Sequence, residues 1–169
     1  MHMSFRWYGE GNDTISLDDI RQIPGVETIV WSLHHKQAGE LWEPEEIEHE
    51  MKLITGLSAD DRKRGVTKTF NADVVESVNV HESIKTGKTM LGMSRDEALE
   101  NYRKTIENLG KAGVKVVTYN FMPVFDWLRT DMFHPSPDGS TALYYDAHKV
   151  AQLTDPQALV DETLNGAGN

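Results

Sequence analysis

The chain of 169 residues contains no cysteine, so it can form neither a disulfide bond nor a thiolate metal site. It has no apolar run approaching the roughly 18 residues of a membrane-spanning helix, and its first residues lack the apolar core of a signal peptide. Its 17 lysines and arginines are scattered, and the formal net charge is −10. Nucleic-acid binding requires a basic patch. The sequence therefore predicts a cytoplasmic protein that has no nucleic-acid partner and does not bind a membrane.

Four short runs rich in β-branched and aromatic residues are present, at residues 4–8, 26–33, 74–80 and 114–124. The second and fourth runs are nearly continuous in apolar residues. This composition is typical of strands that are buried on both faces of a parallel sheet.

Helical signals lie between these runs. The clearest is at Ser94, which forms a capping box with Glu97 and precedes an apolar stripe that ends at Gly113. The expected helices cover residues 16–20, 44–56, 94–113 and 155–164. Strands that alternate with helices predict an α/β fold built from parallel (β/α) units with right-handed crossovers. The polar stretch 58–71 is interpreted as a solvated, mobile connection.

Polar and aromatic residues gather where the predicted strands end, which is where parallel β/α folds place their sites. Carboxylates, amides, imidazoles and guanidinium groups can hydrogen-bond hydroxyls, while aromatic faces cover sugar carbons. Arg6 and Arg129 could clamp a carboxylate through paired hydrogen bonds. The candidate substrate-binding residues are Arg6, Trp7, Tyr8, His35, Glu76, His81, Tyr119, Asn120, Asp126, Trp127 and Arg129.

Each candidate has a structural alternative. The tryptophans could be core residues, and the arginines could pair with carboxylates of this acidic chain. His34 and His35 are adjacent, so an extended chain would point them in opposite directions and at most one would face the site. Glu76 and His81 have an odd separation, so a joint role requires a turn that begins near Asn79.

Read together, the strand-end segments are similar to those of the mannonate dehydratase family. The resemblance runs in the family's order over roughly residues 3–146. It is carried by residues 5–9, 21–25, 39–42, 76–78, 81–85, 101–102, 108–110, 119–124, 126–127, 129–131 and 137–140.

The resemblance implies a (β/α)8 TIM barrel similar to xylose isomerase and a divalent metal, Mn²⁺ or Fe²⁺, in the complete enzyme. It also implies the dehydration of D-mannonate to 2-dehydro-3-deoxy-D-gluconate, a lyase reaction of hexuronate catabolism. By the same resemblance, the metal ligands (His, Cys and Asp) lie in the second half of the barrel. No residue of this chain is therefore expected to bind the metal, and the catalytic acid and base stay unassigned.

Residues 1–169 are accordingly expected to form a single domain, the N-terminal (β/α)4 half of a TIM barrel, with a polar insertion near 58–71. Two alternatives are a truncated or split, non-catalytic half that acts only with a partner, and an isomerase or epimerase of another sugar acid. Half a barrel leaves strand edges unpaired, which predicts a homo-oligomer or a complex with a complementary C-terminal half.

Overall fold

A computed structural model describes residues 2–122, 129–152 and 155 of the chain. The chain forms two compact units, Met1–Phe121 and Met122–Asn169. Each unit is described by itself.

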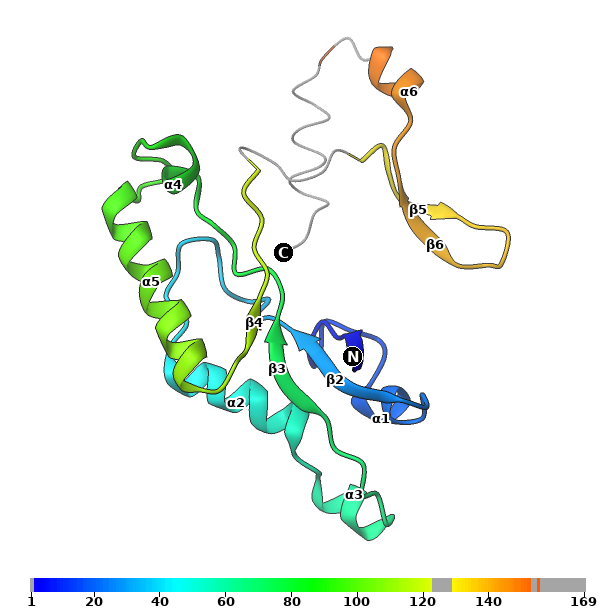
Figure 1. The fold of residues 1–169 in the computed structure, drawn as a ribbon. Coiled ribbons are helices and arrows are strands. Elements are labelled where there is room, and N and C mark those ends of the chain that lie inside the picture. Colours follow the sequence, from blue (N-terminus) through cyan, green and yellow to red (C-terminus); the bar gives the residue numbers. More distant parts are fainter. Residues whose placement is uncertain (1, 123–128, 153–154, 156–169) are drawn as a thin grey trace. The chain divides into compact units, whose positions relative to one another are not determined.

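The first unit is built on a four-stranded parallel sheet in the order β1-β2-β3-β4 (Figure 1). Its strands are β1 (Met3–Arg6), β2 (Val26–Trp31), β3 (Asn71–Val75) and β4 (Val116–Val117). The connections carry the helices α1 (Leu17–Arg21), α2 (Pro44–Thr55), α3 (Ala59–Lys63), α4 (Glu82–Thr86) and α5 (Arg95–Lys111). The predicted α/β fold of parallel (β/α) units is confirmed.

Local capping signals explain where the helices begin and end. The Ser16 hydroxyl accepts a hydrogen bond from the Asp19 backbone N–H, and α2 begins at Pro44 and is followed by Gly56. Before α5, the Ser94 hydroxyl accepts a hydrogen bond from the backbone N–H of Glu97 at 3.2 Å. Helix formation at all three places is confirmed.

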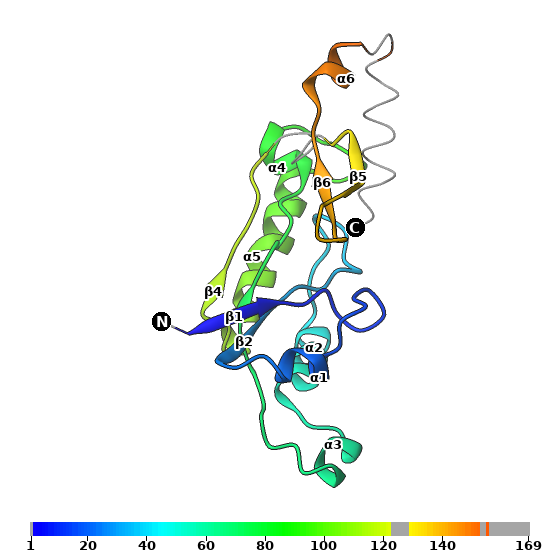
Figure 2. The same ribbon diagram turned by 90° about the vertical axis from the view of Figure 1, so that its right-hand side faces the viewer.

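The core lies between the sheet and the helices α2 and α5, which lie on the same side of it (Figure 2). Trp31 of β2, Ile47 of α2 and Leu109 of α5 are fully buried there. The Trp31 indole N–H donates to the carbonyl of Ala72 at 2.8 Å, which satisfies its one polar group. Burial of large apolar side chains contributes about 1.5–3 kcal/mol each, so this layer provides the main stabilisation of the unit.

Two expected strands have different bounds in the structure. The run at 74–80 becomes β3, which ends at Val75, because Ser77 adopts a left-handed backbone with φ of 61° and turns the chain. The turn therefore begins at Ser77 and not at Asn79. The run at 114–124 contributes only the two residues of β4, although the Val78 N–H still donates to the Thr118 carbonyl at 3.2 Å.

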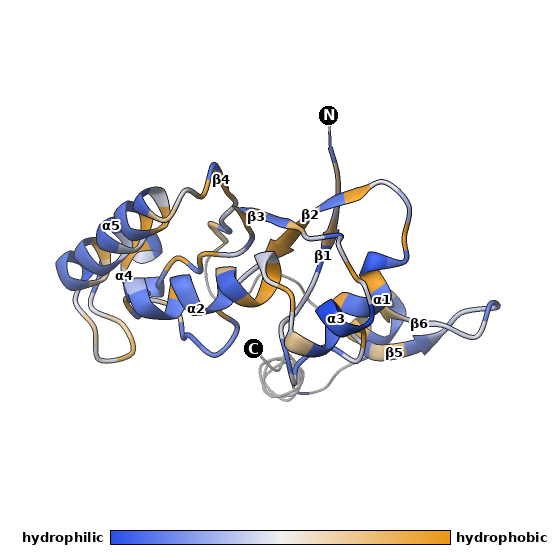
Figure 3. Cartoon of the chain, turned by 90° about the horizontal axis from the view of Figure 1, so that it is seen from below, coloured by the Kyte–Doolittle hydropathy of each residue, from blue (hydrophilic) through white to orange (hydrophobic). Residues whose placement is uncertain are grey.

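The polar stretch 58–71 was expected to be a mobile connection, but it contains helix α3. The Ser58 hydroxyl caps this helix, and Asp61 is buried. Lys68 Nζ donates to the carbonyls of Arg21 and Ile23 at 3.0 and 2.9 Å. The helix is almost wholly hydrophilic (Figure 3), so tertiary ion pairs and hydrogen bonds hold it in place, and the sequence pattern did not show them.

The second unit contains an antiparallel hairpin that the sequence did not predict. Its strands are β5 (Asp131–Pro135) and β6 (Thr141–Tyr144), followed by α6 (Ala147–Ala151). A turn joins these strands, with the Asp138 carboxylate accepting a hydrogen bond from the Ser140 N–H at 3.0 Å. Nearly all of the helix expected at 155–164 lies outside the described residues.

Candidate functional site

Three strand ends bring four side chains together in the first unit. Arg6 Nε lies 3.0 Å from a carboxylate oxygen of Glu76, and the Arg6 guanidinium carbon lies 4.2 Å above the centre of the Tyr8 ring. The Tyr8 ring in turn packs against the ring of His34, with centroids 5.2 Å apart. We call Arg6, Tyr8, His34 and Glu76 the strand-end cluster.

The pleat of the strands explains why these residues meet. Successive side chains of a strand point to opposite faces. Trp7, Trp31 and Val75 are buried in the core, so Arg6 and Glu76, one residue away in the chain, point to the other face. The Trp7 N–H donates to the Val30 carbonyl and the Glu76 N–H to the Trp31 carbonyl, which fixes the three strand ends at one level.

The cation of the cluster has unused hydrogen-bonding capacity. Its Nε pairs with Glu76, and within residues 2–122, 129–152 and 155 Arg6 forms no other ion pair or hydrogen bond. The two terminal nitrogens of a guanidinium form the fork that suits a carboxylate. The side chain is 39% exposed, so a ligand can reach it.

His34 is the cluster residue that the sequence analysis did not select. Its Nε2 is buried and has no hydrogen-bond partner within the described part of the chain. Burial, and secondarily the charges of Arg6 and His35, lower the pKa of His34 below its ordinary value of 6.5. The imidazole is therefore neutral at physiological pH.

His35, the histidine selected from the sequence, lies in a different environment. Its Nε2 lies 3.2 Å from a carboxylate oxygen of Glu46 in α2, and Lys36 Nζ lies 2.8 Å from the other oxygen. Burial alone would raise the pKa of Glu46, but hydrogen bonds from Lys36, from the Glu43 backbone and from His35 lower it. The structure thus places His35 on the helix side and His34 in the strand-end cluster.

Two other candidates are buried. Trp7 is 5% exposed, and its indole N–H donates to the Ile15 carbonyl at 3.0 Å. His81 is 4% exposed, and its Nδ1 caps α4 by accepting a hydrogen bond from the Ser83 N–H at 3.2 Å. Both side chains contribute to packing and local structure in the first unit.

The candidates after β4 are only partly placed. Tyr119 and Asn120 follow β4 at the same edge of the parallel sheet as the strand-end cluster. Burial, and secondarily the Tyr119 phenol, raise the pKa of Tyr102 in α5, so Tyr119 lies near that helix. Asp126 and Trp127 lie outside the described residues, and Arg129 belongs to the second unit.

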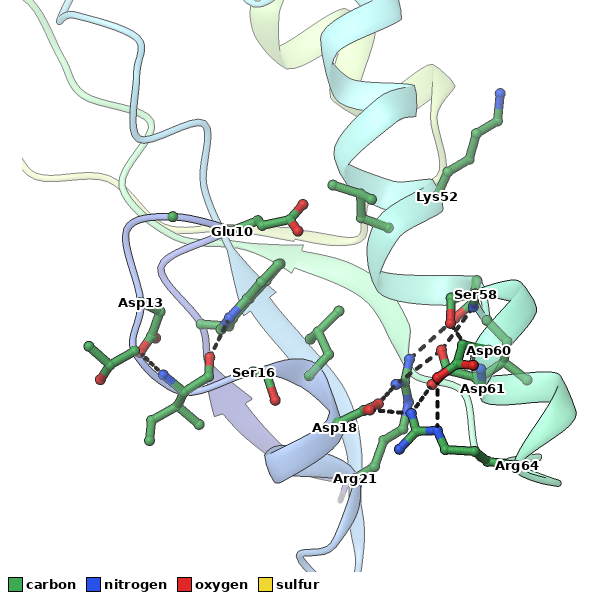
Figure 4. Close-up of a pocket in the computed structure, with 18 residues that line it drawn as sticks. Glu10, Asp13, Ser16, Asp18, Arg21, Lys52, Ser58, Asp60, Asp61 and Arg64 are labelled. Carbon is green, nitrogen blue, oxygen red and sulfur yellow. Dashed lines mark hydrogen bonds and ion pairs between the residues drawn. The ribbon is translucent and has the colours of Figure 1, made fainter.

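A cavity of about 600 Å³ lies elsewhere, between α1, the end of α2 and α3. Figure 4 shows its charged side chains directed at one another: Arg21 and Arg64 point toward Asp18 and Asp61. Arg64 Nη2 donates to Asp61 at 2.6 Å, and Arg21 pairs with Asp18. The ion pairs give the cavity the features of a salt-bridged junction between helices, although the buried Nε of Arg21 has no hydrogen-bond partner within the described residues.

The described residues do not fit a metal centre. Within residues 2–122, 129–152 and 155, no three histidine, aspartate or glutamate side chains come together as a possible ligand set. In the same part of the chain, no helix is long and apolar enough to cross a membrane.

The first unit, a parallel β/α sheet with polar groups at its carboxyl edge, has the arrangement of part of a TIM-barrel-type fold. Comparison with known proteins identifies the family. The family model of D-mannonate dehydratase (UxuA) matches residues 1–168, and the chain belongs to this family.

Individual relatives agree with this assignment. The chain is 54% identical to mannonate dehydratase 1 of Bacillus licheniformis over 162 residues, which are 96% of this chain and 40% of the relative. It is 49% identical to the mannonate dehydratase of Thermotoga maritima over 168 residues, 99% of this chain and 42% of the relative. The chain therefore spans about 40% of the length of these curated relatives.

A solved structure supports the fold. The crystal structure of mannonate dehydratase from Streptococcus suis serotype 2 superimposes with a TM-score of 0.75 and 40% sequence identity. The match covers 96% of this chain and 43% of that chain. The resemblance to the mannonate dehydratase family and the fold class predicted from the sequence are both confirmed.

Proposed function

We propose that this chain provides the sugar-acid-binding strand ends of a mannonate dehydratase, which converts D-mannonate to 2-dehydro-3-deoxy-D-gluconate. The ion pair between Arg6 and Glu76 is the observation that supports it most directly. Glu76 holds the guanidinium through Nε, and the two terminal nitrogens then bind the carboxylate of the substrate.

The reaction explains why a cation is needed at this position. Dehydration removes the proton next to the carboxylate, and negative charge then develops on the carboxylate oxygens. A guanidinium already paired with those oxygens stabilises this charge without reorganisation. The exposed face of Tyr8 covers the carbon chain, and its hydroxyl can bond a substrate hydroxyl. A general acid must still protonate the departing 3-hydroxyl, and we assign it to none of the described residues.

The complete enzyme of this family is proposed to use a divalent metal, Mn²⁺ or Fe²⁺, which would act as a Lewis acid. Because the described residues hold no candidate ligand set, the roles assigned here are confined to the strand-end cluster. We further propose a cytoplasmic location and a place in hexuronate catabolism.

Association is part of the proposal. Within the described residues, β1 and β4 are the edges of the sheet, and Met3, Phe5 and Val116 are exposed there. Unpaired edges with apolar side chains favour pairing with another chain. We expect a homo-oligomer or a complex with a complementary C-terminal half, which sedimentation at micromolar concentration tests. A monomer at that concentration, with no change on adding the complementary half, would contradict this part.

The test of the reaction is a mass-resolved product analysis. D-Mannonate is incubated with the chain, with and without the complementary half, in the presence of Mn²⁺ or Fe²⁺. Dehydration lowers the mass of the sugar acid by one water, whereas isomerisation or epimerisation leaves it unchanged. A product lighter by one water supports the proposal. An isomer of unchanged mass from D-mannonate or another aldonic acid would replace it with an isomerase or epimerase. No product under any of these conditions would leave a non-catalytic barrel half.

A further inference from the structure

The Nε2 atom of His34 is a buried polar atom that lacks a hydrogen-bond partner within the described part of the chain. Buried polar atoms are nearly always paired, and an exception needs an explanation. A histidine that serves only packing normally satisfies its buried ring nitrogens through neighbours, as Nδ1 of His81 is satisfied by Ser83. His34 therefore does not fit the usual description of a core histidine.

The interactions described for His34 involve one cation, one phenol and a second imidazole. Tyr8 packs against its ring, Arg6 stacks on Tyr8, and His35 is its neighbour in the chain. The carboxylate of Glu76 is engaged by Arg6, and Glu46 pairs with His35. Burial is the largest influence that lowers the pKa of His34, and among the neighbouring charges that of Arg6 opposes protonation of the imidazole most strongly.

An anion that binds Arg6 would change this field. Its negative charge would offset the guanidinium charge and weaken the repulsion by which Arg6 opposes charging of the imidazole, while burial would still act against it. By linkage, a ligand that favours the protonated imidazole must itself bind more tightly when the imidazole is protonated.

We propose that His34 is the proton-coupled member of the sugar-acid site, and that its imidazole takes up a proton from solvent when a carboxylate pairs with Arg6. The proton binds at the unprotonated ring nitrogen, and the charge gained there balances the negative charge of the ligand. The inference rests on the proposed function, because it takes the ligand to be a sugar acid. The inference makes His34, and not His35, the histidine of the proposed sugar-acid site.

Calorimetry of the chain measures the proposed proton directly. D-Mannonate is titrated into the chain at about pH 6, in buffers that differ in ionisation enthalpy, because the observed heat then varies with the number of protons taken up. We expect uptake of up to about one proton per ligand in the wild type and in His35→Gln, and none in His34→Gln. Equal uptake in His34→Gln and the wild type, or no uptake in the wild type, would overturn the inference.

An NMR titration of the wild type tests the same proton uptake without relying on a variant that must fold. The pH at which the His34 ring signals titrate is measured in the wild type without ligand and with saturating D-mannonate. It should rise with the ligand, and an unchanged midpoint contradicts the inference.

Acetate at high concentration separates the two proposals, because it offers Arg6 a carboxylate and nothing else. If D-mannonate fails to bind and acetate raises the His34 midpoint, the proposed function fails and the proton coupling stands. If both ligands bind and neither moves the midpoint, the coupling fails and the proposed function stands. If neither ligand binds, both proposals fail.

Discussion

Arg6 and Glu76 form an ion pair of 3.0 Å, although β2 lies between the strands that carry them. The pair joins the carboxyl ends of β1 and β3 on the sheet face opposite to the helical core. Because both side chains are partly exposed, the pair adds little to stability. We propose that the pair serves to orient Arg6: it fixes the guanidinium through Nε and leaves the two terminal nitrogens available to a ligand.

Replacing Arg6 with lysine should separate these two effects. An ammonium group keeps the charge but cannot form the paired hydrogen bonds of a guanidinium. We expect Arg6→Lys to weaken D-mannonate binding about tenfold and to change the free energy of unfolding by less than about 1 kcal/mol. Arg64→Lys, in the ion pairs of α3, is the matched control and should bind normally. Equal affinities of the two variants in calorimetry would rule out Arg6 as the carboxylate anchor.

The lowered pKa of His34 predicts how stability depends on pH. The unfolded chain has a histidine pKa near 6.5, and the folded chain has a lower one. Just below pH 6.5 the unfolded state binds more protons, so the free energy of unfolding rises with pH in this interval. In thermal melts, the stability of His34→Gln should rise less with pH than that of the wild type. The stability of His35→Gln should rise as much as that of the wild type. A wild-type slope in His34→Gln would show that His34 is not the group responsible.

Asp61 should contribute to the stability profile at acidic pH. Hydrogen bonds with the hydroxyl and the backbone N–H of Ser58, together with Arg64 and Arg21, lower its pKa from 3.8 to about 2. A carboxyl with a depressed folded pKa stabilises the protein above the unfolded value and loses that effect as the pH falls through the folded value. Asp61→Asn should therefore flatten the loss of stability between about pH 4 and 2 in melts. Asp60→Asn is the exposed control and should leave it unchanged.

Gly39 is predicted to be a packing-critical glycine. Its φ is 89°, and an added Cβ would lie 2.8 Å from Met93 Sδ and 2.9 Å from His81 Cδ2. Gly25 has a similar φ of 79° but nothing within 4 Å of the same position. Gly25→Ala should cost about 1–2 kcal/mol through backbone strain alone, and Gly39→Ala at least about 1 kcal/mol more through overpacking. Urea unfolding compares them, and equal losses would mean that the contact with His81 relaxes freely.

Local signals explain why much of the fold could be predicted. Ser16, Pro44 and Ser94 mark helix starts through capping and fixed φ, which depend on a few neighbouring residues. Helix α3 could not be predicted in this way, because the contacts of Asp61 and Lys68 reach back to α1 and the residues after it. The fourth run is shortened to the two residues of β4 because strand length depends on pairing with a neighbouring strand, which the local sequence does not specify.

The strand-end rule predicted that Arg6, Tyr8 and Glu76 lie close together, and the structure shows these contacts. Their role in substrate binding stays a prediction. The rule selected His35, whereas the structure brings His34 into contact with Tyr8. The alternation of side chains along an extended strand could have identified His34. Trp31 and Leu33 are apolar and buried, so an extended chain would direct His35 to their side and His34 to the other.

We propose that Arg6 makes this strand end a carboxylate site for a sugar acid. Parallel calorimetric titrations of the chain with D-mannonate and with D-mannitol test it most directly, since the two ligands differ at the carbon that bears the carboxylate. We expect D-mannonate to bind at least about tenfold more tightly than D-mannitol, as for a charge-assisted pair, and Arg6→Lys to remove most of this difference. Equal affinities for the two ligands in the wild type would contradict it.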